Sequence, residues 1–107
     1  MYRHQLRFVL RFGVHAQFNE FAHRLHAAET ARGWTPPCVW HAINGVVNEV
    51  MIEHDYSSFD AFRAERNAFH EHPGEVGEVL ARLGELAVPG TASQSDLDKV
   101  ELASIAA

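Results

Sequence analysis

The first segment of the chain alternates between two kinds of side chain. Over residues 2–12, apolar and aromatic positions recur at every second residue and arginines recur between them. One face carries Tyr2, His4, Leu6, Phe8, Leu10 and Phe12, and the other carries Arg3, Gln5, Arg7, Val9 and Arg11. A two-residue period is typical of a β-strand with one buried face, so this segment is predicted to be a strand.

Three helical segments are predicted from apolar positions that recur at steps of three and four residues. The first follows Gly13 and ends at Gly33, a typical stop residue. Its buried side is predicted to carry Phe18, Phe21, Ala22, Leu25 and Ala28, with Gln17, Asn19, Glu20, Arg24 and Glu29 opposite. The second helix begins with Ser57 as N-cap and is interrupted by Pro73-Gly74. The third covers residues 75–88.

Three further strands complete the predicted secondary structure. Residues 38–43 and 50–56 are predicted to form a hairpin whose turn is marked by Asn44-Gly45. A short last strand is expected within residues 97–105, with Val100 and Leu102 facing inward. The resulting order is β-α-β-β-α-β, with the second helix broken in two. This order predicts a single ferredoxin-like α+β sandwich domain over residues 1–107.

The two faces of the predicted sheet differ in composition. The helix-facing side is expected to carry Leu6, Phe8, Leu10, Val39, Ile43, Val50 and Ile52. The outer side combines two rows of opposite charge, Arg3, Arg7 and Arg11 beside Glu49, Glu53 and Asp55, with Val9, Cys38, Trp40, Ala42 and Met51. Pairing between the two rows is preferred over binding of an anionic ligand by the arginines. Because a mixed apolar and charged face needs a cover, we expect a homodimer packed sheet to sheet.

Composition excludes several classes of function. The 107 residues have nine Lys and Arg against fourteen Asp and Glu, a formal net charge of -5, and no block of basic residues. Nucleic acid and anionic membrane surfaces are therefore not expected as partners. No apolar run approaches a membrane span, so a cytoplasmic location is expected. The single cysteine, Cys38, excludes zinc signatures built on paired cysteines.

The segment from Asn44 to Pro73 resembles the central part of NIPSNAP-type proteins. It has a glycine near the turn, Asn-Glu-Val leading an apolar strand, Tyr56 before the next helix, arginines within that helix, and a proline after it. The match covers about thirty of 107 residues. It differs from the family pattern at His54, where an aromatic or aliphatic residue is commoner, and at Gly74. The resemblance implies a dimeric α+β barrel, a superfamily that includes cofactor-independent monooxygenases, haem-degrading enzymes and isomerases.

Eight histidines are the richest source of candidate chemistry. His41 and His54 share the helix-facing side of neighbouring strands, where imidazole could act as a general acid or base, and Tyr56 is the third candidate catalytic residue. Asn48, Trp40 and Tyr2 are the candidate substrate-binding residues. His4 and His15 are expected to be solvated, as is usual near the ends of elements.

No cofactor or metal is predicted. His23 and His26 lie three residues apart on the first helix, but a metal site needs three or four ligands and the sequence fixes no further one nearby. The nucleotide-binding and nucleophile motifs are also missing from the sequence.

Two classes of function remain. The first is a protein that binds a small hydrophobic molecule, as a cofactor-independent oxygenase, isomerase or cyclase. The second is a non-enzymatic dimeric assembly or partner-binding module. A cavity above about 300 Å³ with convergent polar groups would favour the first class. Phenylalanines that fill this space would favour the second.

Overall fold

The computed structural model describes residues 1–102 of the chain. Its elements are β1 (Tyr2–Val9), α1 (His15–Ala31), β2 (Cys38–His41), β3 (Glu49–Tyr56), α2 (Phe59–Glu71), α3 (Gly74–Glu85) and β4 (Ser93–Asp98). This is the predicted βαββαβ order with the second helix divided, so the ferredoxin-like α+β fold class is confirmed. In the described part of the chain, no helix is both long and apolar enough to span a membrane.

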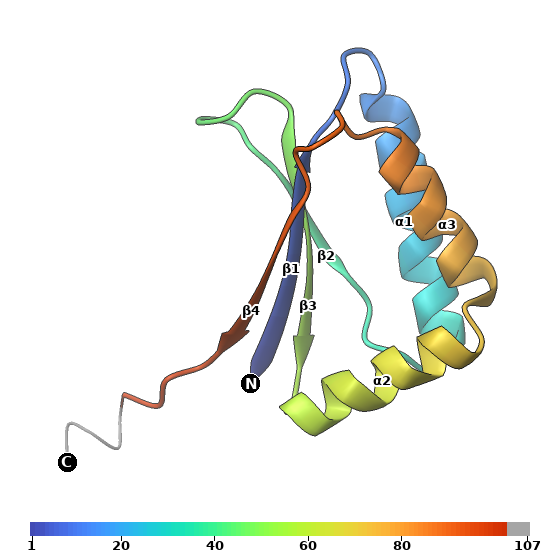
Figure 1. The fold of residues 1–107 in the computed structure, drawn as a ribbon, viewed down its shortest axis with the longest axis vertical. Coiled ribbons are helices and arrows are strands. Elements are labelled where there is room, and N and C mark those ends of the chain that lie inside the picture. Colours follow the sequence, from blue (N-terminus) through green and yellow to red (C-terminus); the bar gives the residue numbers. More distant parts are fainter. Residues whose placement is uncertain (103–107) are drawn as a thin grey trace.

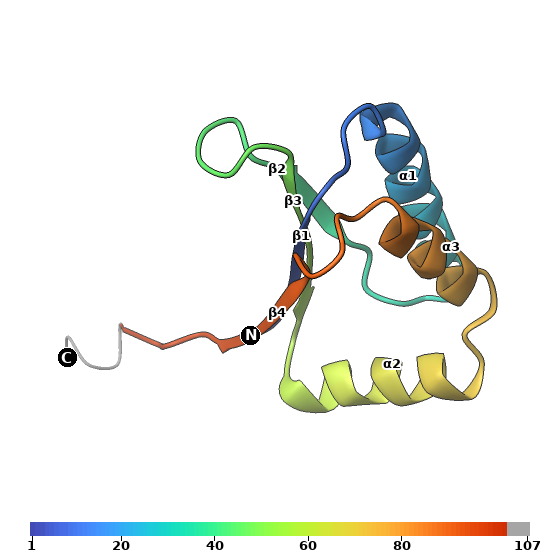
Figure 2. The same cartoon turned by 45° about the horizontal axis from the view of Figure 1, so that its top comes forward.

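One four-stranded sheet forms the first layer and the helices form the second (Figure 1). The strand order is β2-β3-β1-β4, and every neighbouring pair is antiparallel. Helices α1 and α3 lie side by side, and α2 runs from the end of β3 toward their lower ends, which closes the wedge between sheet and helices (Figures 1 and 2). Among the described residues, no helix covers the other face of the sheet (Figure 2).

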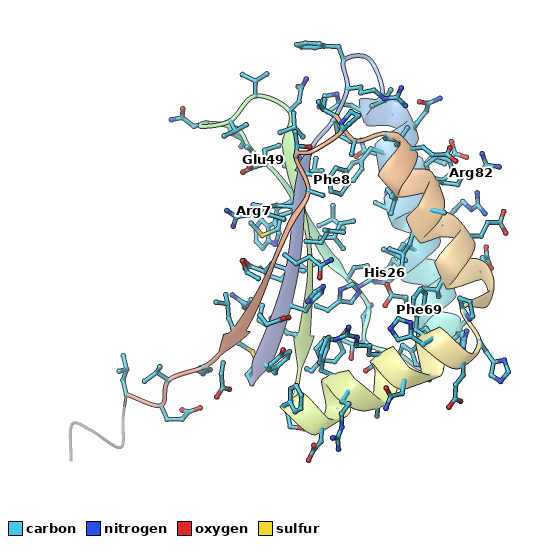
Figure 3. All side chains as sticks on the ribbon, viewed as in Figure 1. Arg7, Phe8, His26, Glu49, Phe69 and Arg82 are labelled. Atoms are coloured by element: carbon cyan, nitrogen blue, oxygen red, sulfur yellow. The ribbon has the colours of Figure 1, made fainter. Side chains whose placement is uncertain are left out.

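The core fills the upper part of this wedge. It consists of Phe8, Leu10, Phe18, Leu25, Ala28, Val50, Ile52, Val76, Val79, Leu83 and Leu86. Figure 3 shows Phe8 pointing from the sheet toward the helices, whereas Arg7 points the other way. The alternation in the sequence therefore predicted the buried face of β1 correctly. Toward α2 the core gives way to polar side chains, because the same faces of β1 and β3 carry histidines there.

Several predicted boundaries were wrong at the ends of elements. The first strand ends at Val9, and beyond it only Leu10 makes an isolated bridge, to Ala87. The first hairpin strand ends at His41 instead of residue 43, and residues 42–48 join it to β3, so Ile43 is 95% exposed instead of facing the helices. The N-cap of α2 is Ser58, not Ser57, because the Ser58 hydroxyl accepts the Ala61 N–H at 3.1 Å.

The last strand was also placed too late in the sequence. Strand β4 pairs with β1 over Ser93–Asp98, whereas Val100 and Leu102 follow the strand and are 66% and 69% exposed. The rest of the predicted strand, from residue 103, lies outside the described residues. All six side chains of β4 are exposed, so apolar periodicity could not reveal this strand.

Only part of the predicted charge pairing is present on the outer face of the sheet. Arg3 donates two hydrogen bonds to Asp55, at 2.7 and 3.0 Å, and lies 3.4 Å from Glu53. These bonds raise the pKa of Arg3, and the guanidinium lowers the pKa of Asp55. Arg7 has no ion-pair partner among residues 1–102, and Arg11 lies beyond β1 and donates to the carbonyl of Glu85 instead.

Candidate active site

A cavity of about 350 Å³ lies between the sheet and α2 and is open to solvent on one side. Its walls come from β1, β3, β4, α2, α3, the end of α1 and the segment that follows α1. The lining residues are His4, Leu6, Glu29, Trp34, Ile52, His54, Tyr56, Phe62, Glu65, Arg66, Phe69, His70, Val76, Leu80, Gln94 and Asp96. Apolar and aromatic side chains thus surround a small number of polar groups, which is the usual composition of a small-molecule site.

His54 is held in this cavity by a buried carboxylate. Its Nε2 lies 2.9 and 3.0 Å from the two oxygens of Glu29, which comes from the last turn of α1. His54 is 9% exposed and Glu29 is 5% exposed. Because an ionised carboxylate only accepts, Nε2 carries the proton of this bond and leaves Nδ1 as the basic nitrogen. Nδ1 has no hydrogen-bond partner within residues 1–102 and is accessible to solvent.

A second histidine–carboxylate pair lies beside the first. His4 on β1 is the register partner of His54 on β3, and both side chains line the cavity. The Nδ1 atom of His4 lies 2.7 Å from a carboxylate oxygen of Asp96 on β4. The ring of His4 also stacks on Phe62, with the centroids 5.7 Å apart. This pair leaves the opposite nitrogen, Nε2, without a protein partner in the described part of the chain.

Tyr56 completes the polar group at this end of β3. It is two residues from His54 on the same strand face, and the two rings stack with centroids 6.1 Å apart. Burial, followed by the carboxylates of Glu65 and Glu29, raises the pKa of Tyr56 well above its ordinary value. The phenol therefore stays protonated at neutral pH and remains available as a hydrogen-bond donor.

The raised pKa of Tyr56 predicts a change in stability at alkaline pH. Because the folded state favours the neutral phenol, this contribution is complete below about pH 10 and is lost as pH rises through the folded pKa. The pKa of Tyr2 is raised less strongly, so tyrosinate absorbance of the folded protein should show Tyr56 as a separate, later step. Tyr56→Phe should remove that step, leaving only Tyr2. Two steps near pH 10 in folded wild-type protein would contradict the prediction.

Two polar contacts fasten α2 and the α2–α3 junction to the segment after α1. The carboxylate of Glu65 accepts both the backbone N–H and the hydroxyl of Thr35, each at 2.8 Å. Arg32 donates to the carbonyl of His72, and its guanidinium lies 3.9 Å from the ring centre of Trp34. Since Trp34 and Glu65 both line the cavity, these contacts fix part of its wall.

Phenylalanines line the cavity without filling it. Phe62 and Phe69 form part of its wall. Phe8 and Phe18 belong to the core above it, and Phe59 is 52% exposed. The sequence did not determine whether this space is a cavity or is filled by phenylalanines. In the structure it is a cavity, and polar groups converge on it.

The structure separates the residues that the sequence grouped together. His54 and Tyr56 line the cavity, whereas His41 is four positions further along the sheet, opposite Val50, and lines a second cavity with His23 and His26. Within residues 1–102, no three His, Cys, Asp or Glu side chains are placed to hold a metal.

The three candidate substrate-binding residues all lie outside this cavity. Trp40 is on the outer face and is 55% exposed, and Asn48 is in the loop before β3. Tyr2 packs at the rim on Phe62, with ring centroids 4.8 Å apart, and partial burial and the Asp96 carboxylate raise its pKa. Trp40, Asn48 and His41 therefore lie apart from the cavity that His54 and Tyr56 line.

Three residues of the site were missed in the sequence. Glu29 was assigned to the exposed side of α1, although it follows Leu25 and Ala22 at helical spacing and is buried. His4 was expected to be solvated, although strand parity puts it on the face of Leu6 and Phe8. Both positions could have been found from periodicity. Asp96 could not, because β4 has no apolar pattern.

Comparison with known proteins agrees with this architecture. No protein-family model matches the sequence, and no curated protein matches it either. Among solved structures, a NIPSNAP domain protein from Burkholderia xenovorans superposes with a TM-score of 0.72 at 13% identity, covering 94% of this chain and 95% of that one. A NIPSNAP family protein from Agrobacterium tumefaciens gives 0.72 at 15% identity, with 94% and 93% coverage.

One of the solved structures with the same fold is described as an enzyme. It is a candidate antibiotic biosynthesis monooxygenase from Deinococcus radiodurans, with a TM-score of 0.67, 12% identity and 94% coverage of both chains. At these identities the similarity establishes the fold alone. The NIPSNAP-like architecture that the segment from Asn44 to Pro73 suggested is thus confirmed, while the reaction has to be argued from this chain's own residues.

Proposed function

Starting from the fold that this chain shares with solved NIPSNAP proteins, we propose that it binds a small, largely apolar carbonyl compound and removes a proton from the carbon next to the carbonyl. The observation that carries this proposal is the His54–Glu29 pair at the wall of a 350 Å³ cavity. Loss of such a proton is a shared first step of isomerisation, cyclisation and cofactor-independent oxygenation. It therefore covers the three reaction types that the sequence suggested.

The geometry supports His54 as the general base. Glu29 accepts the proton of Nε2, which fixes the ring and stabilises the imidazolium that forms when Nδ1 takes a proton. The carboxylate is itself nearly inaccessible, so its interaction with the imidazolium is weakly screened by water. The pair thus has the arrangement expected of an oriented base.

Tyr56 supports the same reaction as a hydrogen-bond donor beside His54. Removing a proton beside a carbonyl leaves an enolate, whose oxygen needs a hydrogen-bond donor. The raised pKa keeps the Tyr56 phenol protonated, and its hydroxyl has no partner of its own within residues 1–102. Trp34, Phe62 and Phe69 supply aromatic walls for an apolar or aromatic substrate body.

Deuterium exchange tests this function without knowledge of the natural substrate. The protein is incubated in D₂O with β-tetralone, a small aromatic ketone, and exchange beside the carbonyl is followed by NMR. We expect exchange well above the buffer rate and above that of Tyr56→Phe. His41→Ala, which changes a histidine outside the cavity, serves as the matched control and should leave the rate unchanged. Exchange at the buffer rate across a panel of such ketones would overturn the proposal.

We also propose that the outer sheet face binds a second copy of the chain. Trp40 is 55% exposed there and lies opposite the partly exposed Met51, beside charges of both signs. A self-complementary face of this composition suits a two-fold dimer. A non-enzymatic assembly module, the second candidate function, rests on the same observation.

Replacing Trp40 tests the dimer. Trp40→Ala should raise the dimer dissociation constant at least tenfold in sedimentation equilibrium, because large aromatic side chains contribute strongly to interfaces. Phe12→Ala is the matched control, since Phe12 is 86% exposed but follows β1 instead of lying on the sheet face. An unchanged dissociation constant for Trp40→Ala, or a monomeric wild-type protein, would contradict this interface.

A further inference from the structure

The cavity holds a second oriented imidazole directly beside the first. His4 and His54 are opposite each other on two antiparallel strands, and both face the cavity. Side chains at such positions have Cβ atoms about 5 Å apart. Their carboxylates come from different elements, Asp96 from β4 and Glu29 from α1, so each ring is fixed independently.

The two histidines expose opposite ring nitrogens. His54 uses Nε2 for Glu29 and leaves Nδ1, whereas His4 uses Nδ1 for Asp96 and leaves Nε2. Either free nitrogen can carry a proton or lack one, so a protonated ring can donate a proton while its neutral neighbour accepts one. A single base would need only one of these two pairs.

We infer that His4 is a second catalytic residue, a general acid, and that the natural substrate is a β,γ-unsaturated carbonyl compound, which the site converts to its conjugated isomer. This inference rests on the proposed function, because it takes His54 as the base. It goes further by assigning the reaction to isomerisation, in which a proton leaves one carbon and a proton enters another two carbons away. Two imidazoles carried on Cβ atoms about 5 Å apart can both reach such a three-carbon unit.

The steps balance without any further reactant. His54 Nδ1 takes the proton from the carbon next to the carbonyl, and the electron pair of that C–H bond passes into a dienolate. The dienolate oxygen accepts a hydrogen bond from the Tyr56 hydroxyl. His4, as imidazolium, gives its Nε2 proton to the γ-carbon, and the dienolate electron pair forms the new C–H bond. His54 then holds one proton more and His4 one fewer. Both return to their starting states by exchange with water at the open side of the cavity.

Allyl phenyl ketone measures the two steps separately. In D₂O, deuterium at the carbon next to the carbonyl reports proton removal, and formation of the conjugated propenyl ketone reports delivery at the γ-carbon. We expect wild-type protein to catalyse both. His4→Gln should lower isomerisation about 10²- to 10⁴-fold, the usual contribution of a general acid, while exchange stays within about threefold of wild type.

Asp96→Asn tests the positioning of His4. It should lower the ratio of isomerisation to exchange, as His4→Gln does, but by a smaller factor. If Asp96 had only a structural role, this ratio would stay unchanged. His15→Gln, at the exposed start of α1, is the matched control and should not change the ratio. Thermal melts identify any variant that fails to fold. If His4→Gln does not fold, Asp96→Asn tests the inference with His4 unchanged.

The outcomes separate the inference from the function on which it rests. Exchange without isomerisation in wild-type protein overturns the inference and leaves the proposed function intact. Equal loss of exchange and isomerisation in folded His4→Gln also overturns it, as does isomerisation that His4→Gln leaves unchanged. Absence of both reactions in wild-type protein overturns the proposed function together with the inference.

Discussion

Replacing His54 with glutamine is expected to lower ketone exchange by about 10²- to 10⁴-fold while the protein stays folded. Glutamine can still donate a hydrogen bond to Glu29, so the buried carboxylate keeps a partner. What the variant loses is a nitrogen that can accept a proton. The measurement is the exchange rate of β-tetralone in D₂O, with circular dichroism and a thermal melt of each variant.

Glu29→Gln separates the base from its orienting partner. The amide oxygen can accept the His54 N–H, so the fold should persist, but the charge that stabilises the imidazolium is gone. We expect a loss smaller than that in His54→Gln, with an added shift in the pH dependence of the rate. If the rate of folded His54→Gln fell by less than threefold, His54 could not be the base.

Sequence periodicity predicted those parts of the fold that hydrophobic burial determines. The alternation in β1 identified Leu6 and Phe8 as buried-face residues, and helical spacing identified Leu25 in α1 and Val79 in α3. Pro73-Gly74 correctly marked the break between α2 and α3, because proline has no N–H for the helix and Gly74 adopts φ of +52°.

Errors arose where backbone hydrogen bonds determine the structure. Strand β4 exists because its backbone pairs with β1, although every side chain in it is exposed. The connection over residues 42–48 includes Gly45 and Asn48 at positive φ, and regular pairing between β2 and β3 ends at His41. The dipeptide Asn44-Gly45 marked a turn correctly but did not determine the length of the loop.

The sequence could predict which site residues share a face of one strand, but not which residues of different elements come into contact. Tyr56 and His54 share a face by parity, and both line the cavity. The same parity put His41 on the helix side, but parity does not say how far apart two residues lie along a sheet. The pairs of His54 with Glu29 and of His4 with Asp96 join residues 25 and 92 positions apart, so they depend on how α1 and β4 pack.

Leu25→Ala is expected to have the largest effect on stability, about 2–5 kcal/mol less free energy of unfolding. Leu25 is fully buried in the core, and alanine would leave a cavity there that neighbouring side chains fill only in part. Because Leu25 is one turn before Glu29 on α1, the same change should loosen the helix end that holds His54. Urea denaturation measures the first effect and ketone exchange the second.

Glu20→Ala provides the matched control on the same helix, since Glu20 is exposed and should change the unfolding free energy by no more than about 0.5 kcal/mol. A loss below about 1 kcal/mol in Leu25→Ala would contradict the packing described for the core. If the variant is destabilised yet exchanges deuterium at the wild-type rate, the contact between Glu29 and His54 does not depend on core packing one turn away. The base would then be held chiefly by its own hydrogen bonds.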